Sequence, residues 1–141
     1  MSVTVKKITL WRREIENKPG SLAAVLTPLA GAGADLQVVM GYRHPGHESE
    51  ASIEVSPVTG KKATKAAQDA GLGASVIPTL LVQGENQPGL GAAISKALAD
   101  AGVNLAFLVA QVVGDRFSAV IGFDNPEDAA KASSMVKKAA R

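Results

Sequence analysis

The sequence contains the same stretch twice. Glu16-Asn17-Lys18-Pro19-Gly20 returns at an offset of 69 residues as Glu85-Asn86-Gln87-Pro88-Gly89, and an ungapped alignment of residues 16–36 with residues 85–105 gives 11 identities in 21 positions. The offset is about half of the 141 residues. A repeat of this length is the mark of a duplicated structural unit. We therefore expect two modules of one fold, residues 1–78 and residues 79–141.

The first copy has the hydrophobic pattern of a small α+β module. Residues 7–15, 34–40 and 51–55 alternate apolar and polar side chains, as strands with one buried face do. Between the first two strands, four apolar residues recur at helical spacing: Leu22, Val25, Leu26 and Leu29. A loop over residues 42–48, an Ala/Lys-rich helix over about 59–70 and a short apolar strand at 75–77 complete the order β-α-β-β-α-β.

The second copy repeats this order up to its last helix. Strands are predicted at residues 80–82, 103–109 and 117–123, and helices at residues 88–101 and from residue 125 onward. The pattern predicts an α+β fold of two ferredoxin-like βαββαβ modules, each an antiparallel sheet with its helices on one face. Since the sequence runs out after the last helix, we expect the second module to lack its last strand.

A missing last strand would leave Leu80–Val82 as an open apolar edge of the second sheet. Either the long N-terminal strand, which Val3 and Val5 extend, or a second copy of the chain could cover that edge. The homodimer is the favoured hypothesis.

Composition excludes several classes of function. There are 15 Lys and Arg against 13 Asp and Glu, and a net charge of +2 does not indicate nucleic-acid binding. The absence of cysteine excludes thiol catalysis and thiolate metal sites. No apolar segment is long enough to cross a membrane and the N-terminus does not resemble a signal peptide, so a cytoplasmic protein is expected.

No pattern of catalytic residues emerges either. The sequence has no spaced carboxylate pair, no P-loop and no nucleophile elbow, so we expect no enzyme, no catalytic residue and no cofactor. Both histidines lie in His44-Pro45-Gly46-His47-Glu48, which is more typical of a solvent-exposed hairpin tip than of a metal site.

The repeated Asn-x-Pro-Gly motif suits a zwitterion. Pro19 and Pro88 are expected as first helical residues, which leaves Asn17 free of ordinary capping. The N–H groups of Gly20, Ser21 and Leu22 would then have no helical acceptor and would favour a carboxylate. The asparagine oxygen can accept a hydrogen bond from an ammonium group. The alternative is a strand-to-helix turn with no ligand.

The order of strand, Glu-Asn-x-Pro-Gly, Leu/Ala-rich helix, Gly, and Asp-Leu or Asn-Leu resembles the ACT domain over nearly the whole chain, in two tandem copies. The resemblance implies an amino-acid-sensing regulatory module of a metabolic enzyme, with modules that pair side by side and ligand near the first strand–helix loop. The ligand-binding residues that it implies are Asn17, Pro19, Gly20, Ser21, Leu22, Asp35, Asn86, Pro88, Gly89, Leu90 and Asn104. Gly91 departs from the family's pattern, which has leucine there, and Pro28 lies inside the first helix, where a bend or break is expected.

Together these features predict an amino-acid-binding regulatory protein, an allosteric sensor of two ACT-like modules with no attached catalytic domain. The expected ligand is a small amino acid or similar zwitterion, and the expected partners are a second copy of the chain and a metabolic enzyme. The alternative is a protein-interaction subunit that acts on a partner enzyme without binding a ligand itself.

Overall fold

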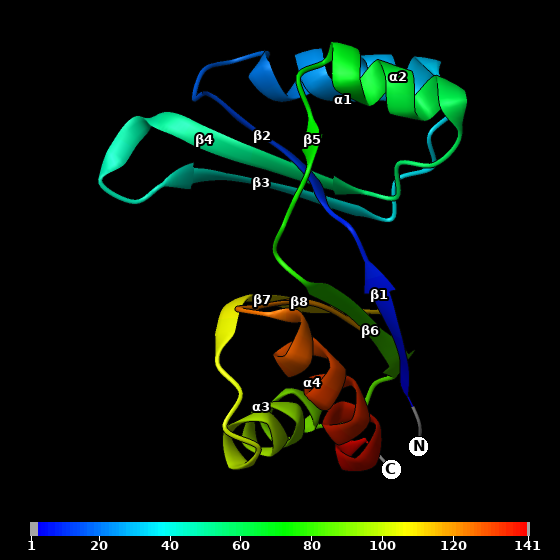
Figure 1. Cartoon of the computed structure of the whole chain (residues 1–141), viewed down its shortest axis with the longest axis vertical. Coiled ribbons are helices and arrows are strands. Elements are labelled where there is room, and N and C mark those ends of the chain that lie inside the picture. The colour runs from blue at the N-terminus through cyan, green and yellow to red at the C-terminus, as the bar shows by residue number, and fades with distance from the viewer. Residues whose placement is uncertain (1–2, 141) are drawn as a thin grey trace. The chain divides into compact units, whose positions relative to one another are not determined.

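The computed structural model describes residues 3–140, which form two compact units (Figure 1). Thr9–Ser75 make the N-terminal module. The C-terminal module combines two separate stretches of chain, Met1–Ile8 and Val76–Arg141.

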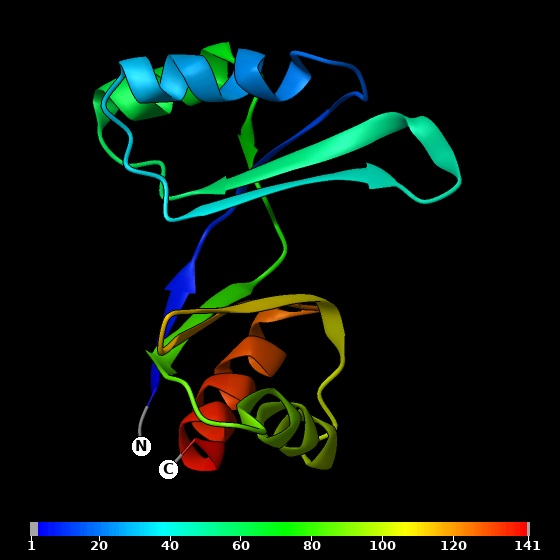
Figure 2. The same ribbon diagram turned by 180° about the vertical axis from the view of Figure 1, so that it is seen from behind.

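The N-terminal module is a four-stranded antiparallel sheet with two helices on one face (Figures 1 and 2). Its sheet has the order β3-β4-β2-β5. In chain order its elements are β2 (Trp11–Glu16), α1 (Ser21–Gly31), β3 (Val38–His44), β4 (His47–Ser56), α2 (Lys61–Asp69) and β5 (Gly73–Ala74). Under the helices, the sheet contributes Ile53 and Val55 to a core that Val25 and Leu29 of α1 complete.

The C-terminal module has the same architecture. Its elements are β6 (Thr79–Glu85), α3 (Leu90–Asp100), β7 (Leu105–Val113), β8 (Arg116–Phe123) and α4 (Pro126–Ala139), with β1 (Val3–Ile8) from the N-terminus. The sheet order is β1-β6-β8-β7. Figure 2 shows α3 and α4 together on one face of this sheet. The two modules therefore confirm the predicted α+β class and the ferredoxin-like arrangement.

The strand expected to be missing is present, and it is β1. It pairs antiparallel with β6 from Val3↔Gly84 to Ile8↔Thr79, and the side chains of Val3 and Val5 pack on the core of the C-terminal module. The structure thus divides the chain differently from the expected 1–78 and 79–141. The favoured idea that a second copy covers the edge at Leu80–Val82 is wrong, because β1 lies on one side of β6 and β8 on the other.

Two local expectations also change. The segment predicted as a loop over residues 42–48 belongs largely to β3 and β4, which meet at a tight turn where Gly46 has φ 79°. Helix α1 is continuous through Pro28, so the proline does not break it. Ala24, whose carbonyl loses its helical donor to this proline, is exposed, and water can supply the missing bond.

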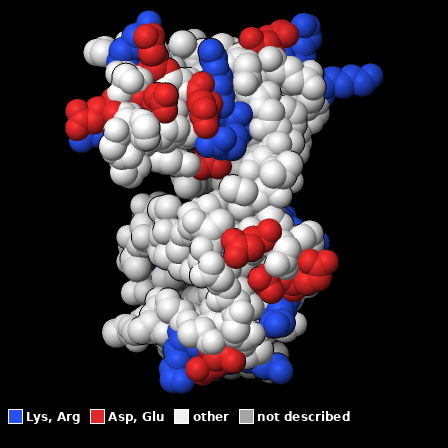
Figure 3. Space-filling model, turned by 60° about the vertical axis from the view of Figure 1, so that its left-hand side comes forward, with Lys and Arg blue, Asp and Glu red and all other residues white. Residues whose placement is uncertain are grey.

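Strand β7 is an unusual edge. It is the outermost strand of its sheet, has nine residues, and contains no charged side chain. Four of its apolar residues are largely exposed: Leu108, Val109, Val112 and Val113. In Figure 3, acidic and basic side chains are interspersed over the N-terminal module, whereas the C-terminal module presents a broad uncharged area. Among the described residues, no helix is long and apolar enough to span a membrane.

Candidate functional site

The Asn-x-Pro-Gly motif of the N-terminal module is a type II turn. The N–H of Ser21 donates to the carbonyl of Lys18 at 3.3 Å, and Gly20 has φ 91° and ψ −15°. Proline at the second position and a positive φ at the third define this turn, and only glycine adopts that φ without strain. Helix α1 therefore begins at Ser21, with Gly20 as its cap, and Pro19 is not the first helical residue as predicted.

The second copy folds in the same way. The N–H of Leu90 donates to the carbonyl of Gln87 at 3.2 Å, and Gly89 has φ 85° and ψ 3°. Pro88 again precedes the glycine, outside the helix. The repeat thus preserves a turn whose backbone geometry explains both the proline and the glycine.

The turn takes up one of the three N–H groups that were predicted to be free, that of Ser21. The first helical bond runs from the N–H of Ala24 to the carbonyl of Gly20 at 3.0 Å. Among the described residues, the N–H groups of Leu22 and Ala23 have no acceptor. These two donors carry the positive end of the helix dipole.

Asn17 connects the turn to the start of β4. Its N–H donates to the carbonyl of Ser49 at 2.9 Å, and its Nδ2 donates to the carbonyl of Glu48 at 2.8 Å. The side chain is therefore held by the fold, although it does not cap the helix. Within residues 3–140 no donor contacts Oδ1, which keeps its capacity to accept a hydrogen bond.

A cleft of about 220 Å³ lies against this turn. Residues of β2, β3 and β4 form part of its wall, and the turn with the first residues of α1 forms another part. The lining residues are Ile15, Glu16, Asn17, Lys18, Ser21, Leu22, Gly41, Tyr42, Arg43, Ala51, Ser52 and Ile53. An apolar wall with polar groups at one side is the usual form of a small-molecule site.

The structure brings only part of the predicted set together. Asn17, Ser21 and Leu22 line the cleft beside the Pro19-Gly20 turn. Asp35 lines a different cleft of about 500 Å³ between the end of α1 and the start of α2. An 11-residue helix separates the two places by about 16 Å.

In the C-terminal module, the predicted residues likewise contact different parts of the fold. Asn86 donates its N–H to the carbonyl of Asp115 at 2.8 Å, which ties the turn to the β7–β8 hairpin. Nδ2 of Asn104 lies 3.4 Å from Oδ2 of Asp124, beyond the far end of α3. Leu90 is only 3% exposed and belongs to the core, whereas Leu22 is 41% exposed. Leu90 corresponds to Ser21 of the first copy, so the leucine lies one position earlier and packs inward.

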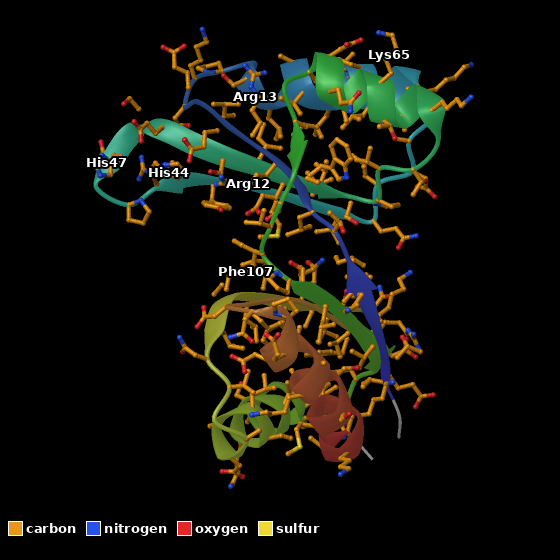
Figure 4. The ribbon with its side chains drawn as sticks, in the orientation of Figure 1. Arg12, Arg13, His44, His47, Lys65 and Phe107 are labelled. Carbon is orange, nitrogen blue, oxygen red and sulfur yellow. The ribbon has the colours of Figure 1, made fainter. Side chains whose placement is uncertain are left out.

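Sequence reasoning missed a polar network on the helix-free face of the N-terminal sheet. Figure 4 shows the neighbouring Arg12 and Arg13 on opposite faces of β2. Arg13 donates to the carbonyl of Ala70 at the end of α2, at 2.8 Å. On the other face Nη2 of Arg12 donates to Oγ of Ser52 at 2.9 Å, and its Nε lies 3.8 Å from the carboxylate of Glu54.

Three further contacts extend this network. The hydroxyl of Tyr42 donates to Glu54 at 2.8 Å, and Nε2 of His44 lies 2.7 Å from Oγ of Ser52. Nδ1 of His44 lies 3.5 Å from the carboxylate of Glu50. Burial, and then the hydrogen bond and charge of Glu54, raise the pKa of Tyr42. Ser52, Glu54 and Ser56 alternate with Ala51, Ile53 and Val55 along β4, and this pattern was the available signal.

The fold and the repeated turn define the class, a tandem of ferredoxin-like α+β modules. The chain belongs to the ACT domain pair family, which it matches over residues 3–139. No curated protein matches the sequence.

Solved structures with the same fold include a protein from Bacteroides thetaiotaomicron, with 18% identity, a TM-score of 0.75, and coverage of 95% of this chain and 98% of that one. The ligand-free regulatory subunit of aspartate kinase from Thermus thermophilus has 20% identity and a TM-score of 0.66, over 100% and 98% of the two chains. Aspartate kinase from Clostridium acetobutylicum has 16% identity and a TM-score of 0.64, over 99% of this chain and 34% of that one. At such identities the likeness establishes the fold.

Proposed function

We propose that this protein is a regulatory ACT domain pair that binds a small amino acid in the cleft of its N-terminal module. The observation that carries the proposal is that residues of the type II turn, together with Leu22, whose N–H has no acceptor among the described residues, line the 220 Å³ cleft. The N–H groups of Leu22 and Ala23 and the helix dipole suit the α-carboxylate. Oδ1 of Asn17 suits the α-ammonium.

The other predicted residues divide by role. Pro19 and Gly20 set the turn, while Ser21 and Leu22 line the cleft. Asn86, Pro88, Gly89 and Leu90 would make a second, equivalent position in the C-terminal module. Asp35 and Asn104 would act only in an assembly that brings them to a ligand.

A steric block in the cleft tests the proposal. Gly41 lines the cleft opposite Ile53 in the strand register, and a Cβ built on it meets no atom within 4 Å. A valine there suits a strand and should fill the cleft without disturbing the fold. Gly73→Val is the matched control, because Gly73 is also in a strand with open space around it and does not line the cleft.

The measurement is calorimetric titration of the intact chain with the common amino acids. Wild type and Gly73→Val should bind the same amino acid with similar affinity, and Gly41→Val should lose that binding. Asn17→Ala should weaken it by roughly 1–3 kcal/mol, the scale of a hydrogen bond to a charged group. Binding that survives Gly41→Val would move the site elsewhere, and no binding of any amino acid would contradict the function.

A second candidate function has an observation of its own. The side-chain amide of Asn17 and the N–H groups of Asn17 and Ser21 all bond within the fold, so the motif has a structural purpose without ligand. The protein would then be an interaction subunit that regulates an enzyme by contact alone. Binding to a partner enzyme that no amino acid alters would favour this alternative.

We also propose a homodimer, and its position follows from β7. The strand offers nine uncharged residues, exposed apolar side chains and an unpaired backbone edge. Two copies of such an edge can pair antiparallel about a two-fold axis. Light scattering at micromolar concentration should give a dimer that Val109→Lys weakens. Val39→Lys, at a similarly exposed valine of β3, should leave it intact, and a wild-type monomer would contradict the proposal.

The similarity to the regulatory subunit of aspartate kinase leads us to propose an enzyme of amino-acid metabolism as the partner, and the cytoplasm as the place of action. Ligand and partner would then be linked by differential binding, since a ligand shifts an assembly only when it binds one state more tightly than another. Co-purification of the tagged chain with such an enzyme, in the presence and absence of the amino acid, tests that link.

A further inference from the structure

The arginines of the N-terminal module differ in their partners. Arg12 contacts Ser52 and Glu54, and Arg13 donates to the carbonyl of Ala70. Arg43 is exposed and lines the cleft, and its side chain makes no hydrogen bond or ion pair within residues 3–140. The first two arginines therefore hold the fold together, and Arg43 does not.

The other two charged residues of the cleft pair with each other. Nζ of Lys18 lies 3.0 Å from Oε2 of Glu16, and both residues line the cleft. This pair leaves the guanidinium of Arg43 as the uncompensated charge among the cleft residues that the structure describes. A ligand with a cationic side chain would meet Arg43 as a like charge, and Glu16, the carboxylate that lines the cleft, is already paired with Lys18.

The position of Arg43 also suits a second anionic group on the ligand. In the strand register Arg43 pairs with Ala51 and Gly41 pairs with Ile53, so Arg43 and Gly41 share one face of β3. The free N–H groups of Leu22 and Ala23 lie at the start of α1, a different element from β3, and Leu22 lines the cleft. The cleft thus offers two separate positions for negative charge, one on a helix end and one on a strand.

Resting on the proposed function, we propose that the cleft selects an amino acid with a carboxylate side chain, of the aspartate or glutamate class, and that Arg43 is the specificity-determining residue. The α-carboxylate is received at the start of α1 and the side-chain carboxylate by the guanidinium. Arginine presents a planar fork of donors that matches a carboxylate and cannot be replaced by an uncharged group of similar size.

Ligands of nearly the same shape but different charge isolate the effect of the ligand's charge on its affinity. Calorimetry on the intact chain compares L-aspartate with L-asparagine and L-glutamate with L-glutamine, with L-lysine as the oppositely charged ligand. At least one acid should bind about tenfold or more tightly than its amide, and this advantage should shrink as salt is raised. Arg43→Gln should remove the advantage and leave the affinity for the amide within about twofold.

Arg116→Gln is the matched control, an exposed arginine of β8 in the C-terminal module, and it should keep the preference for the acid. Fluorescence of Trp11, which packs against the core of the N-terminal module, checks that Arg43→Gln is folded. An amide or L-lysine that binds as tightly as the acids would overturn this inference while leaving the amino-acid site in place. If no amino acid binds, and Gly41→Val changes nothing, the proposed function itself fails and this inference with it.

Discussion

Removing residues 1–8 should unfold the C-terminal module and spare the N-terminal one. The deletion takes away β1, whose six residues pair with β6, and it strips three half-buried apolar side chains, Val3, Val5 and Ile8, from the sheet. Full burial of such a side chain contributes about 1.5–3 kcal/mol, so three half-buried ones contribute roughly 3–4 kcal/mol before the lost ladder is counted. A module of this size is stable by only about 4–10 kcal/mol, so most of its stability disappears.

The aromatic residues of the chain allow the unfolding of the two modules to be followed separately. Its single Trp and single Tyr, Trp11 and Tyr42, both lie in the N-terminal module, so their fluorescence reports that module alone. Circular dichroism reports the helices of both. In urea, the truncated chain should keep the fluorescence transition of the full chain and lose much of the helical signal before denaturant is added.

A circular permutant is the matched control. Strand β1 contacts α4, and Figures 1 and 2 draw the start of β1 beside the end of α4, so residues 1–8 can be rejoined after Arg141 through a short flexible linker. The permutant has the ordinary ferredoxin-like order of strands and should recover the helical signal. A truncated chain that retains its full helical signal and urea midpoint would refute the assignment of β1 to the C-terminal module.

Three further predictions follow from single residues. The ultraviolet titration of Tyr42, the only tyrosine, should have a midpoint above its ordinary pKa of about 10, because burial and Glu54 favour the neutral phenol, and Glu54→Gln should lower it. Because the pKa of Tyr42 is higher in the folded state than in the unfolded state, the shift contributes to the stability of the fold fully below pH 10, and that contribution is lost as pH rises through the folded pKa. A titration midpoint of Tyr42 at or below 10 would contradict this prediction. Pro28→Ala should increase the free energy of unfolding of the N-terminal module by roughly 1–3 kcal/mol and so raise the urea midpoint measured by fluorescence. An unchanged midpoint would show that the helix already accommodates the proline. Gly122→Ala should destabilise the C-terminal module by roughly 1–3 kcal/mol in thermal unfolding, because the new Cβ overlaps the ring of Phe107, and truncating Phe107 should relieve the loss.

Local pattern predicted the elements but not which strands pair. Alternation from residue 7 to residue 15 predicted a single strand, and the structure divides it at Thr9 and Leu10 into β1 and β2, which belong to different modules. No glycine or proline marks the division, and both halves alternate in the same way. Alternation of apolar residues indicates which face of a strand is buried. It carries no information on which other strand lies beside it.

The sequence predicted the turn of the candidate site but not all of the residues that line the cleft beside it. Proline followed by glycine restricts the backbone to few conformations, so the place of the strand-to-helix turn could be found from the sequence. The cleft also needs Gly41 and Arg43 from β3, in a stretch expected in part as loop. Asp35 was included by position in a family pattern, and a helix of 11 residues separates it from the turn.

The two copies of the turn show what duplication keeps and what it leaves free to change. Both retain proline followed by a glycine with a positive φ, the two residues that favour a type II turn. The next two residues are not bound by that geometry: Ser21 and Leu22 line a cleft in one module, whereas Leu90 fills the core and Gly91 follows it in the other. A leucine in the core contributes stability, and an exposed leucine beside free N–H groups does not. Leu22 is thus available for contact with something outside the module, and the amino-acid titration with Gly41→Val decides whether that is a ligand.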